Sequence, residues 1–340
     1  MSKASYRLID YSLRPAKSIE RKMLAEAFRR LTFFDHVSNY RYIGFGSTYF
    51  TDFILFHRTL GIRDMISIEE RVTDKPRFEF NRPFNCIKME YENSNTVLPR
   101  LDWSKEVIIW LDYDKGLGVQ KLQDIACVCA KAVSGSVLIV TVNAHPIDVL
   151  RNRDLETEEE RQQFRMRKFV EGVGESRASD FSSTDLKGWN LAKTYRKVIL
   201  NEVEQTLADR NGLVSVEHKK MRYQPLFNFH YSDGPKMLTV GFILYAEEDV
   251  EKVNMCDFED PGLDFIRTGS DAYQIQVPRL THRERRYLDK TLPLIAGEDV
   301  EEGDSETDVE EDVDIGIPPR DIEHYIRLYR YFPNFAETEL

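Results

Sequence analysis

Short apolar runs alternate with amphipathic helical stretches between Arg41 and Pro146, and this alternation constrains the fold more than any other feature. The apolar runs lie at 42–45, 65–68, 86–89, 107–111 and 137–142, while helical periodicity covers 48–60 and 119–133. Apolar strands followed by amphipathic helices form parallel sheets with helices on both faces. We therefore predict an α/β fold with five strands in this region.

The second half of the chain is predicted to hold charged helices followed by a β-hairpin. Helical patterns cover 157–170 and 191–207, with a Gly/Ser-rich break at 172–183 between them. Two strand patterns, 221–231 and 237–245, flank a short polar turn that contains Asp233-Gly234, which favours a hairpin. Thr281 and Glu284 form a capping-box pattern at the start of a further helix, which ends before Pro293.

A helix is also predicted near the N-terminus, at 18–31, with Ser18 as its N-cap. Four basic residues lie around its start, namely Arg14, Lys17, Arg21 and Lys22. We interpret these charges as a solvated helix face.

These patterns predict five regions along the chain. They are a helical N-terminal segment (1–40), an α/β domain (41–296), a helical insertion within it (148–211), an acidic disordered linker (297–316) and a C-terminal docking helix (317–340). The α/β domain should hold a mostly parallel, seven-stranded sheet that ends in the antiparallel hairpin.

Composition excludes several classes of protein. No apolar run approaches the ~20 residues of a membrane span, and no signal segment opens the chain, so we expect a cytoplasmic protein.

The net charge of −11 comes from residues 298–314, which include eleven acidic residues and no basic ones. The rest is close to neutral, and nucleic-acid binding is not indicated. The four cysteines include no CxxC pair, so neither a zinc site nor a disulfide framework is expected.

The segment Gly44-Phe45-Gly46-Ser47 lies between the first predicted strand and the helix after it. At such a junction the first glycine permits a tight turn, and the second lets a ligand approach the backbone. The next helix directs its free N–H groups at that ligand. An ordinary glycine turn is the alternative, but the position at the first βα junction favours a binding loop.

Polar side chains follow three other predicted strands. Glu69 ends the second strand, where a carboxylate can accept hydrogen bonds from both hydroxyls of a ribose, and Glu70 is the alternative if the strand is longer. Asp112 and Asp114 follow the fourth strand, beside the expected ligand position. Asp112 could bind a cationic ligand, act as a general base on a hydroxyl or bind Mg²⁺.

The fifth strand is followed by Asn143 and His145, which should point to the same edge of the sheet. His145 could serve as a base, although it precedes Pro146 and could equally cap the strand. We therefore name Asp112, Asp114 and His145 as the candidate catalytic residues.

The stretch from Arg41 to Glu70 resembles the cofactor half of class I S-adenosylmethionine-dependent methyltransferases, which have a Rossmann-like fold. More narrowly, residues 42–53, 14–23 and 280–293 resemble a bacterial O-methyltransferase family. The resemblance implies S-adenosyl-L-methionine as the cofactor. It also implies that the turn from Gly44 to Ser47 holds the methionine end, that Glu69 holds the ribose, and that Asp112 closes the site.

The sequence departs from the common pattern of that class in three places. Tyr42 replaces the usual acid before the first glycine, and Ser47 follows Gly46 directly, so a third glycine is missing. Val142 occupies the position of an aspartate that binds Mg²⁺ in some O-methyltransferases, so no metal site is predicted.

Two other functions are compatible with these features. A nicotinamide dehydrogenase uses a similar glycine turn, but nothing after Pro146 resembles a second mononucleotide-binding half. A methyltransferase-like interaction module would bind a protein partner through its acidic segment and C-terminal helix.

If the chain is a methyltransferase, we predict direct in-line transfer of the methyl group to an oxygen nucleophile. The insertion 148–211 would form a lid over the acceptor, whose identity the sequence does not reveal. A homodimer is kept as a further hypothesis.

Overall fold

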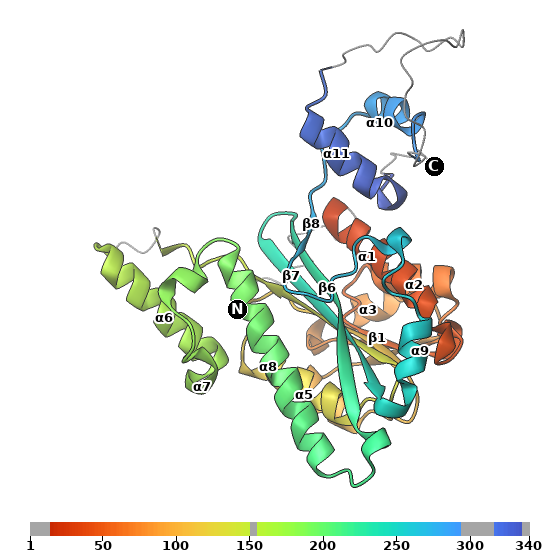
Figure 1. The fold of residues 1–340 in the computed structure, drawn as a ribbon, viewed down its shortest axis with the longest axis vertical. Coiled ribbons are helices and arrows are strands. Elements are labelled where there is room, and N and C mark those ends of the chain that lie inside the picture. Colours follow the sequence, from red (N-terminus) through yellow and green to blue (C-terminus); the bar gives the residue numbers. More distant parts are fainter. Residues whose placement is uncertain (1–13, 150–154, 294–315, 335–340) are drawn as a thin grey trace.

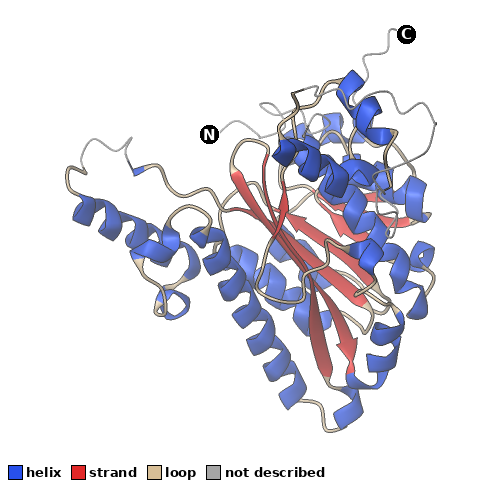
Figure 2. Cartoon of the chain, turned by 45° about the horizontal axis from the view of Figure 1, so that its top comes forward, coloured by secondary structure: helices blue, strands red, loops and turns tan. Residues whose placement is uncertain are grey.

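The structure is a computed structural model that describes residues 14–149, 155–293 and 316–334. Within these residues, one twisted sheet of eight strands forms the centre of the molecule, and helices pack on both of its faces (Figures 1 and 2). The strand order is β3-β2-β1-β4-β5-β7-β6-β8. The strands are β1 (Arg41–Gly44), β2 (Asp64–Ile68), β3 (Ile87–Glu90), β4 (Val107–Asp112), β5 (Ser136–Asn143), β6 (Met221–Ser232), β7 (Lys236–Ala246) and β8 (Tyr273–Ile275).

The first five strands are all parallel, which confirms the prediction from the alternating pattern. The residues of β1, β2, β4 and β5 are almost entirely buried because helices cover both faces, and this burial explains why these runs are apolar. At the edge strand β3 only Ile87 is buried. Gly44 lies opposite Ser67 of β2 and Trp110 of β4, so the carboxyl ends of these three strands meet at one edge.

The hairpin of β6 and β7 is antiparallel, and β7 pairs with β5 over the whole length of that strand. An eighth strand, β8, pairs in parallel with the end of β6. The prediction of seven strands is therefore wrong by one. Because β8 has three residues, its sequence is too short to show a strand pattern.

Two apolar clusters fill the space between the sheet and its helices. One lies between the sheet and α1 (Pro15–Phe28), α2 (Thr51–Leu60) and α9 (Val250–Met255). The other lies under α5 (Val119–Lys131) and α8 (Asn190–Gly212), on the opposite face. Two short helices, α3 (Lys75–Asn81) and α4 (Ser94–Val97), flank β3 and were not predicted.

Two helix starts differ from prediction. The first helix begins at Pro15 and not after Ser18, because Pro15 supplies the fixed backbone angle that suits a first helical position. The second begins at Thr51, three residues later than expected, because Ser47 and Phe50 adopt left-handed backbone conformations. Its end at Leu60 agrees with the predicted range, and Gly61 follows with a φ of 73°, which suits glycine at the end of a helix.

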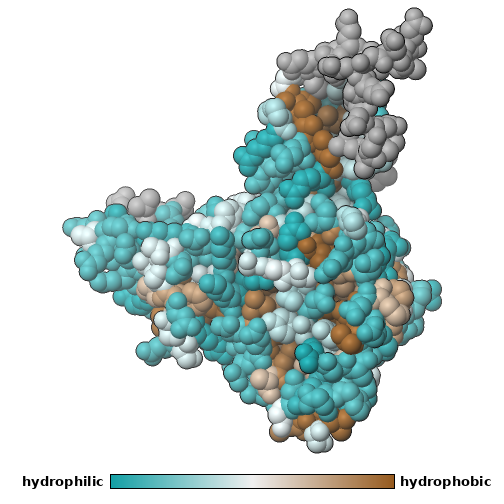
Figure 3. All heavy atoms as spheres, in the orientation of Figure 1, coloured by the Kyte–Doolittle hydropathy of each residue, from teal (hydrophilic) through white to brown (hydrophobic). Residues whose placement is uncertain are grey.

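The insertion holds α6 (Glu158–Val173), α7 (Glu175–Ala178) and α8. Helices α6 and α7 project at the left of Figure 1, whereas α8 packs beside α5 on the sheet. A capping box between Thr157 and Glu160 starts α6. The predicted Gly/Ser break contains α7 and is therefore not a plain loop. On the face drawn in Figure 3, the insertion is mostly hydrophilic.

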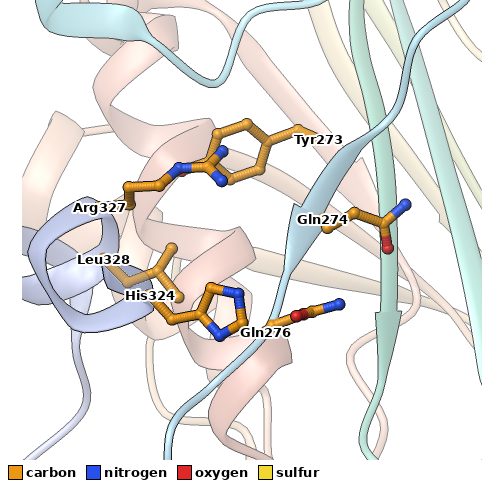
Figure 4. A pocket seen from close by; sticks show the side chains of 6 residues that line it. All are labelled: Tyr273, Gln274, Gln276, His324, Arg327 and Leu328. Carbon is orange, nitrogen blue, oxygen red and sulfur yellow. The ribbon is translucent and has the colours of Figure 1, made fainter. Parts of the chain in front are cut away.

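The C-terminal part packs α10 (His282–Asp289) against α11 (Pro319–Leu328), with the predicted capping box of Thr281 and Glu284 in place. Helix α11 also contacts β8, where the guanidinium of Arg327 lies 4.7 Å from the ring centroid of Tyr273 (Figure 4). The acidic stretch 298–314 lies outside the described residues, so its role stays a prediction. No helix of the described residues is both long and apolar enough to cross a membrane.

Candidate functional site

The glycine turn after β1 is fixed to the neighbouring strand and to its own helix. The N–H of Gly46 donates to Ser67 Oγ at 3.1 Å, and the N–H of Phe50 donates to Gly46 O at 2.7 Å. Ser47 has a φ of 50°, which non-glycine residues adopt rarely and usually where the surroundings hold them in place. The turn predicted from the sequence is therefore a rigid structure at the carboxyl edge of the sheet.

Gly46→Ala should lower the free energy of unfolding by about 1–3 kcal/mol, because the added methyl group has no space. A Cβ at this position would lie 2.6 Å from Phe50 Cδ1 and 2.8 Å from Ser67 Oγ. Chemical denaturation followed by circular dichroism measures the change. Gly212→Ala is the matched control, since nothing lies within 4 Å of a Cβ there. Equal stability of the two variants would contradict this packing.

Glu69 lies directly beyond β2 and contacts the glycine turn, as the sequence predicted for a shared site. The N–H of Ser47 donates to Glu69 Oε1 at 2.8 Å. Burial raises the pKa of the Glu69 carboxyl to about 8, although the Ser47 N–H opposes the shift. Its neighbour Glu70, the alternative candidate, is exposed. The Ser67 hydroxyl and the Gly46 N–H also interact with this carboxyl, so Glu69 is fixed between β2 and the turn at the edge where a ligand would lie.

Asp112 ends β4, and its position at the carboxyl edge agrees with the prediction. The ammonium group of Lys17 on α1 contacts it, with 2.9 Å between Lys17 Nζ and Asp112 Oδ1. Lys17 is fully buried, whereas the Asp112 side chain is 24% exposed. Lys17 also pairs with Glu20 Oε2 at 2.8 Å and lies 4.1 Å from the ring centroid of Trp110. Asp112 is therefore held in place by a buried cation.

The interpretation of the basic residues on α1 as a solvated face is wrong. Arg14, Lys17 and Arg21 are at most 8% exposed. Lys22 is half-buried and donates to the carbonyl oxygens of Tyr331 and Phe332. The start of the helix is held by Asp233 in the β6–β7 turn, whose carboxylate accepts from the N–H groups of Ala16 and Lys17 at 3.1 and 3.0 Å. The positive end of a helix favours such an anion. Helix α1 thus covers the carboxyl edge and forms one wall of the site.

A second buried acid lies beside the end of β1. The hydroxyl of Tyr42 donates to Asp52 of α2, and a Cβ at Gly44 would lie 2.7 Å from that hydroxyl. Burial raises the pKa of Asp52, while the nearby Arg21 guanidinium opposes the shift. Tyr42 stands where the common pattern has an acid, and its hydroxyl is bonded to the carboxyl of Asp52.

A polar cluster that sequence reasoning missed joins the segments after β3 and β4. Asp124 on α5 is 2% exposed and accepts from Ser94 Oγ and Tyr113 Oη at 2.6 Å each, and from Asn95 Nδ2 at 2.5 Å. The ring of Tyr113 also lies 5.3 Å from that of Phe45 in the glycine turn. A buried aspartate in an apolar helix was the signal, because such a group needs partners from elsewhere in the fold.

Tyr113→Phe should cost about 1–2 kcal/mol of folding free energy, because a buried carboxyl loses one of its donors. Thermal unfolding measures the loss. Tyr91→Phe removes a hydroxyl bonded to the half-buried Glu79, whose carboxyl can still reach water, and should cost less. A Tyr113 variant as stable as the Tyr91 variant would show that the Asp124 cluster does not depend on this hydrogen bond.

The remaining candidates lie together where β4 and β5 end. The Asn143 side chain accepts from the N–H of His145 at 2.8 Å, and its Nδ2 lies 3.5 Å from the carbonyl oxygen of Asp114. The exposed His145 ring faces the N–H of Lys236, with 3.5 Å between Nδ1 and N. The insertion adjoins this place, because a Cβ at Gly116 would lie 3.0 Å from Tyr195 Oη of α8. The described residues include no group of three side chains able to hold a metal ion.

The order β3-β2-β1-β4-β5-β7-β6, with β7 antiparallel and a glycine turn after β1, is that of the Rossmann-like class I methyltransferases. The chain belongs to the family described as "Putative O-methyltransferase", whose model matches residues 9–340. No curated protein matches the chain.

Solved structures match the chain at low sequence identity. Trm1 from Pyrococcus horikoshii, in complex with S-adenosyl-L-methionine, is 9% identical with a TM-score of 0.43, over 74% of this chain and 61% of that chain. A protein from Listeria monocytogenes described as a "putative S-adenosylmethionine dependent methyltransferase" is 12% identical with a TM-score of 0.37, over 65% of this chain and 98% of that chain. The plantazolicin methyltransferase BamL is 9% identical with a TM-score of 0.34, over 67% and 86%. The family assignment therefore rests on the match over residues 9–340.

Proposed function

We propose that this protein is an S-adenosyl-L-methionine-dependent O-methyltransferase. The observation that carries the proposal is the junction of the glycine turn with Glu69, in which Ser47 N and Glu69 Oε1 are 2.8 Å apart. At this junction, a turn whose backbone a ligand can approach closely lies beside an acid that can accept hydrogen bonds from ribose hydroxyls. The family description supports the methyl transfer, and oxygen as the acceptor atom rests on that description.

The residues of the carboxyl edge fit the parts of this cofactor. Gly44, Phe45, Gly46 and Ser47 would hold the methionine end, and Glu69 the ribose. Asp112, with one oxygen on Lys17, keeps Oδ2 for the cationic end of the ligand. Tyr113 would flank the adenine, together with Ser94 and Asn95, which donate to the same Asp124 carboxylate.

When bound, the cofactor supplies the methyl group for an in-line transfer to an oxygen nucleophile. The chain's own residues would orient the acceptor and exclude water, and a base would take the acceptor proton. We assign Asp112 to orientation, because Lys17 holds it. Asp114 and His145 are our candidates for the base, since both are exposed where β4 and β5 end. The neighbouring insertion would cover the acceptor.

Calorimetric titration of the purified protein with S-adenosylmethionine and S-adenosylhomocysteine tests the proposal. Micromolar binding of both compounds is the expected result. A tritiated methyl group on the cofactor then reports transfer to a panel of phenols and carboxylic acids, and alkali distinguishes methyl ethers from esters. A folded protein that binds neither compound would overturn the proposal and favour the interaction module, whose partner would be sought with and without residues 298–314.

A further inference from the structure

Arg21 carries a buried guanidinium with an unused hydrogen-bond donor. The residue lies on the inner face of α1 and is 5% exposed. Its Nε has no hydrogen-bond partner among the described residues. A buried charged donor without an acceptor costs free energy, because the group has lost its water and gained nothing in return. Such a donor beside a binding edge indicates that a ligand supplies the acceptor.

The position of Arg21 places this donor at the end of β1. Its charge acts on both Tyr42 and Asp52, which are joined by a hydrogen bond. The Tyr42 hydroxyl lies 2.7 Å from the position of a Cβ on Gly44, where the glycine turn begins. Arg21 therefore adjoins the part of the turn to which the methionine end of the cofactor is assigned.

A second buried polar group without a hydrogen-bond partner among the described residues belongs to the same turn. Thr48 follows Ser47 directly, is 7% exposed, and has a hydroxyl Oγ1 without a hydrogen-bond partner among the residues that the structure describes. A guanidinium and a hydroxyl can both donate to a single acceptor group. The other cations near the start of α1 are engaged. Lys17 pairs with Glu20 and Asp112, and Arg14, which precedes the helix, pairs with Asp233. Lys22 donates to the carbonyl oxygens of Tyr331 and Phe332.

The chemistry of the two donors selects a carboxylate as the ligand group. A planar guanidinium matches a carboxylate in geometry as well as in charge. The nearby acids Asp52, Asp112 and Glu69 would repel an anion that lacked such a partner. We propose that Arg21, assisted by Thr48, binds the α-carboxylate of the cofactor's methionine moiety. This inference rests on the proposed function and adds Arg21 of α1 and Thr48 of the turn to the same site.

The test compares S-adenosylhomocysteine with its decarboxylated analogue, S-adenosyl-thiopropylamine, by calorimetry. The two compounds differ only in the carboxylate. We expect the wild-type protein to bind S-adenosylhomocysteine about 10–100-fold more tightly than the analogue. Arg21→Met should remove most of this ratio by weakening S-adenosylhomocysteine alone, and Thr48→Val should reduce the ratio by a smaller factor. Arg29→Met, an exposed position just after α1, should leave the ratio unchanged.

The affinities for the two compounds distinguish a carboxylate-binding role of Arg21 from a purely structural one. Equal affinities of the wild-type protein for the two compounds would overturn the inference without any variant, so misfolding of Arg21→Met cannot obscure the result. An Arg21→Met protein that is folded by circular dichroism but binds both compounds more weakly by the same factor would show a structural role only. Wild-type protein that binds neither compound would overturn the proposed function itself, and the inference with it.

Discussion

Lys17→Met is expected to lower the free energy of unfolding by about 3–5 kcal/mol, because it leaves Glu20 as an unpaired buried charge. Glu20 has no exposed side-chain surface, and its ion pair is with Lys17. Asp112, the other partner, is 24% exposed and can still reach water, so Glu20 should account for most of the loss. Urea denaturation followed by circular dichroism measures the effect.

A second substitution separates lost charge pairing from lost packing. Adding Glu20→Gln to Lys17→Met removes the stranded carboxylate and should restore about half of the lost stability or more. Arg29→Met is the control for removal of a cation in this part of the chain, and its ion pair with Glu26 is exposed and long at 3.9 Å. If the double variant were less stable than Lys17→Met, the buried charges would not be coupled as described.

Glu69→Ala should weaken the binding of S-adenosylhomocysteine by about 100-fold or more. The proposed role gives this carboxylate two charge-assisted hydrogen bonds to the ribose, each of about 1.5–3 kcal/mol. Calorimetric titration at pH 9, where the group is ionised, gives the largest difference. Glu70→Gln is the matched control, because Glu70 is the exposed neighbour. Unchanged affinity of the Glu69 variant would remove this residue from the site.

The pH dependence of stability provides an independent test of the Glu69 environment. Its pKa in the folded protein is raised to about 8, above the ordinary value of 4.5. Its contribution to stability is therefore complete below about pH 4.5 and is lost as the pH rises through 8. Glu69→Gln cannot ionise, so it should be more stable than the wild type at pH 9, by about 1–3 kcal/mol, and similar at pH 5. Equal stabilities at both values would show that Glu69 ionises freely.

The parallel half of the sheet could be predicted because each of its strands is a continuous apolar run beside an amphipathic helix. The β6–β7 hairpin was equally clear from its Asp-Gly turn. Strand β8 was missed because three residues are too few to show an alternating pattern. The start of α2 was misplaced because Ser47 and Phe50 adopt left-handed conformations, which a sequence usually signals only by a glycine.

The site was predictable only where its residues lie at strand ends. Gly46 and Glu69 were found because a parallel sheet brings its carboxyl ends to one edge, whatever the rest of the chain does. Lys17 could not be found in this way, because its partners Asp112 and Tyr231 are 95 and 214 residues away in the sequence. The residues that neighbour Lys17 in the sequence therefore do not distinguish a buried lysine from an exposed one.

The link between the first helix and the β6–β7 turn affects the order in which the chain can mature during synthesis. The N–H groups at the start of α1 are held by Asp233, which the ribosome adds 216 residues after Lys17. A nascent chain that ends after β5 already contains the five parallel strands, yet the carboxylate that holds its first helix has not been made. The wall of the site nearest the N-terminus is therefore completed late, when the hairpin joins the sheet.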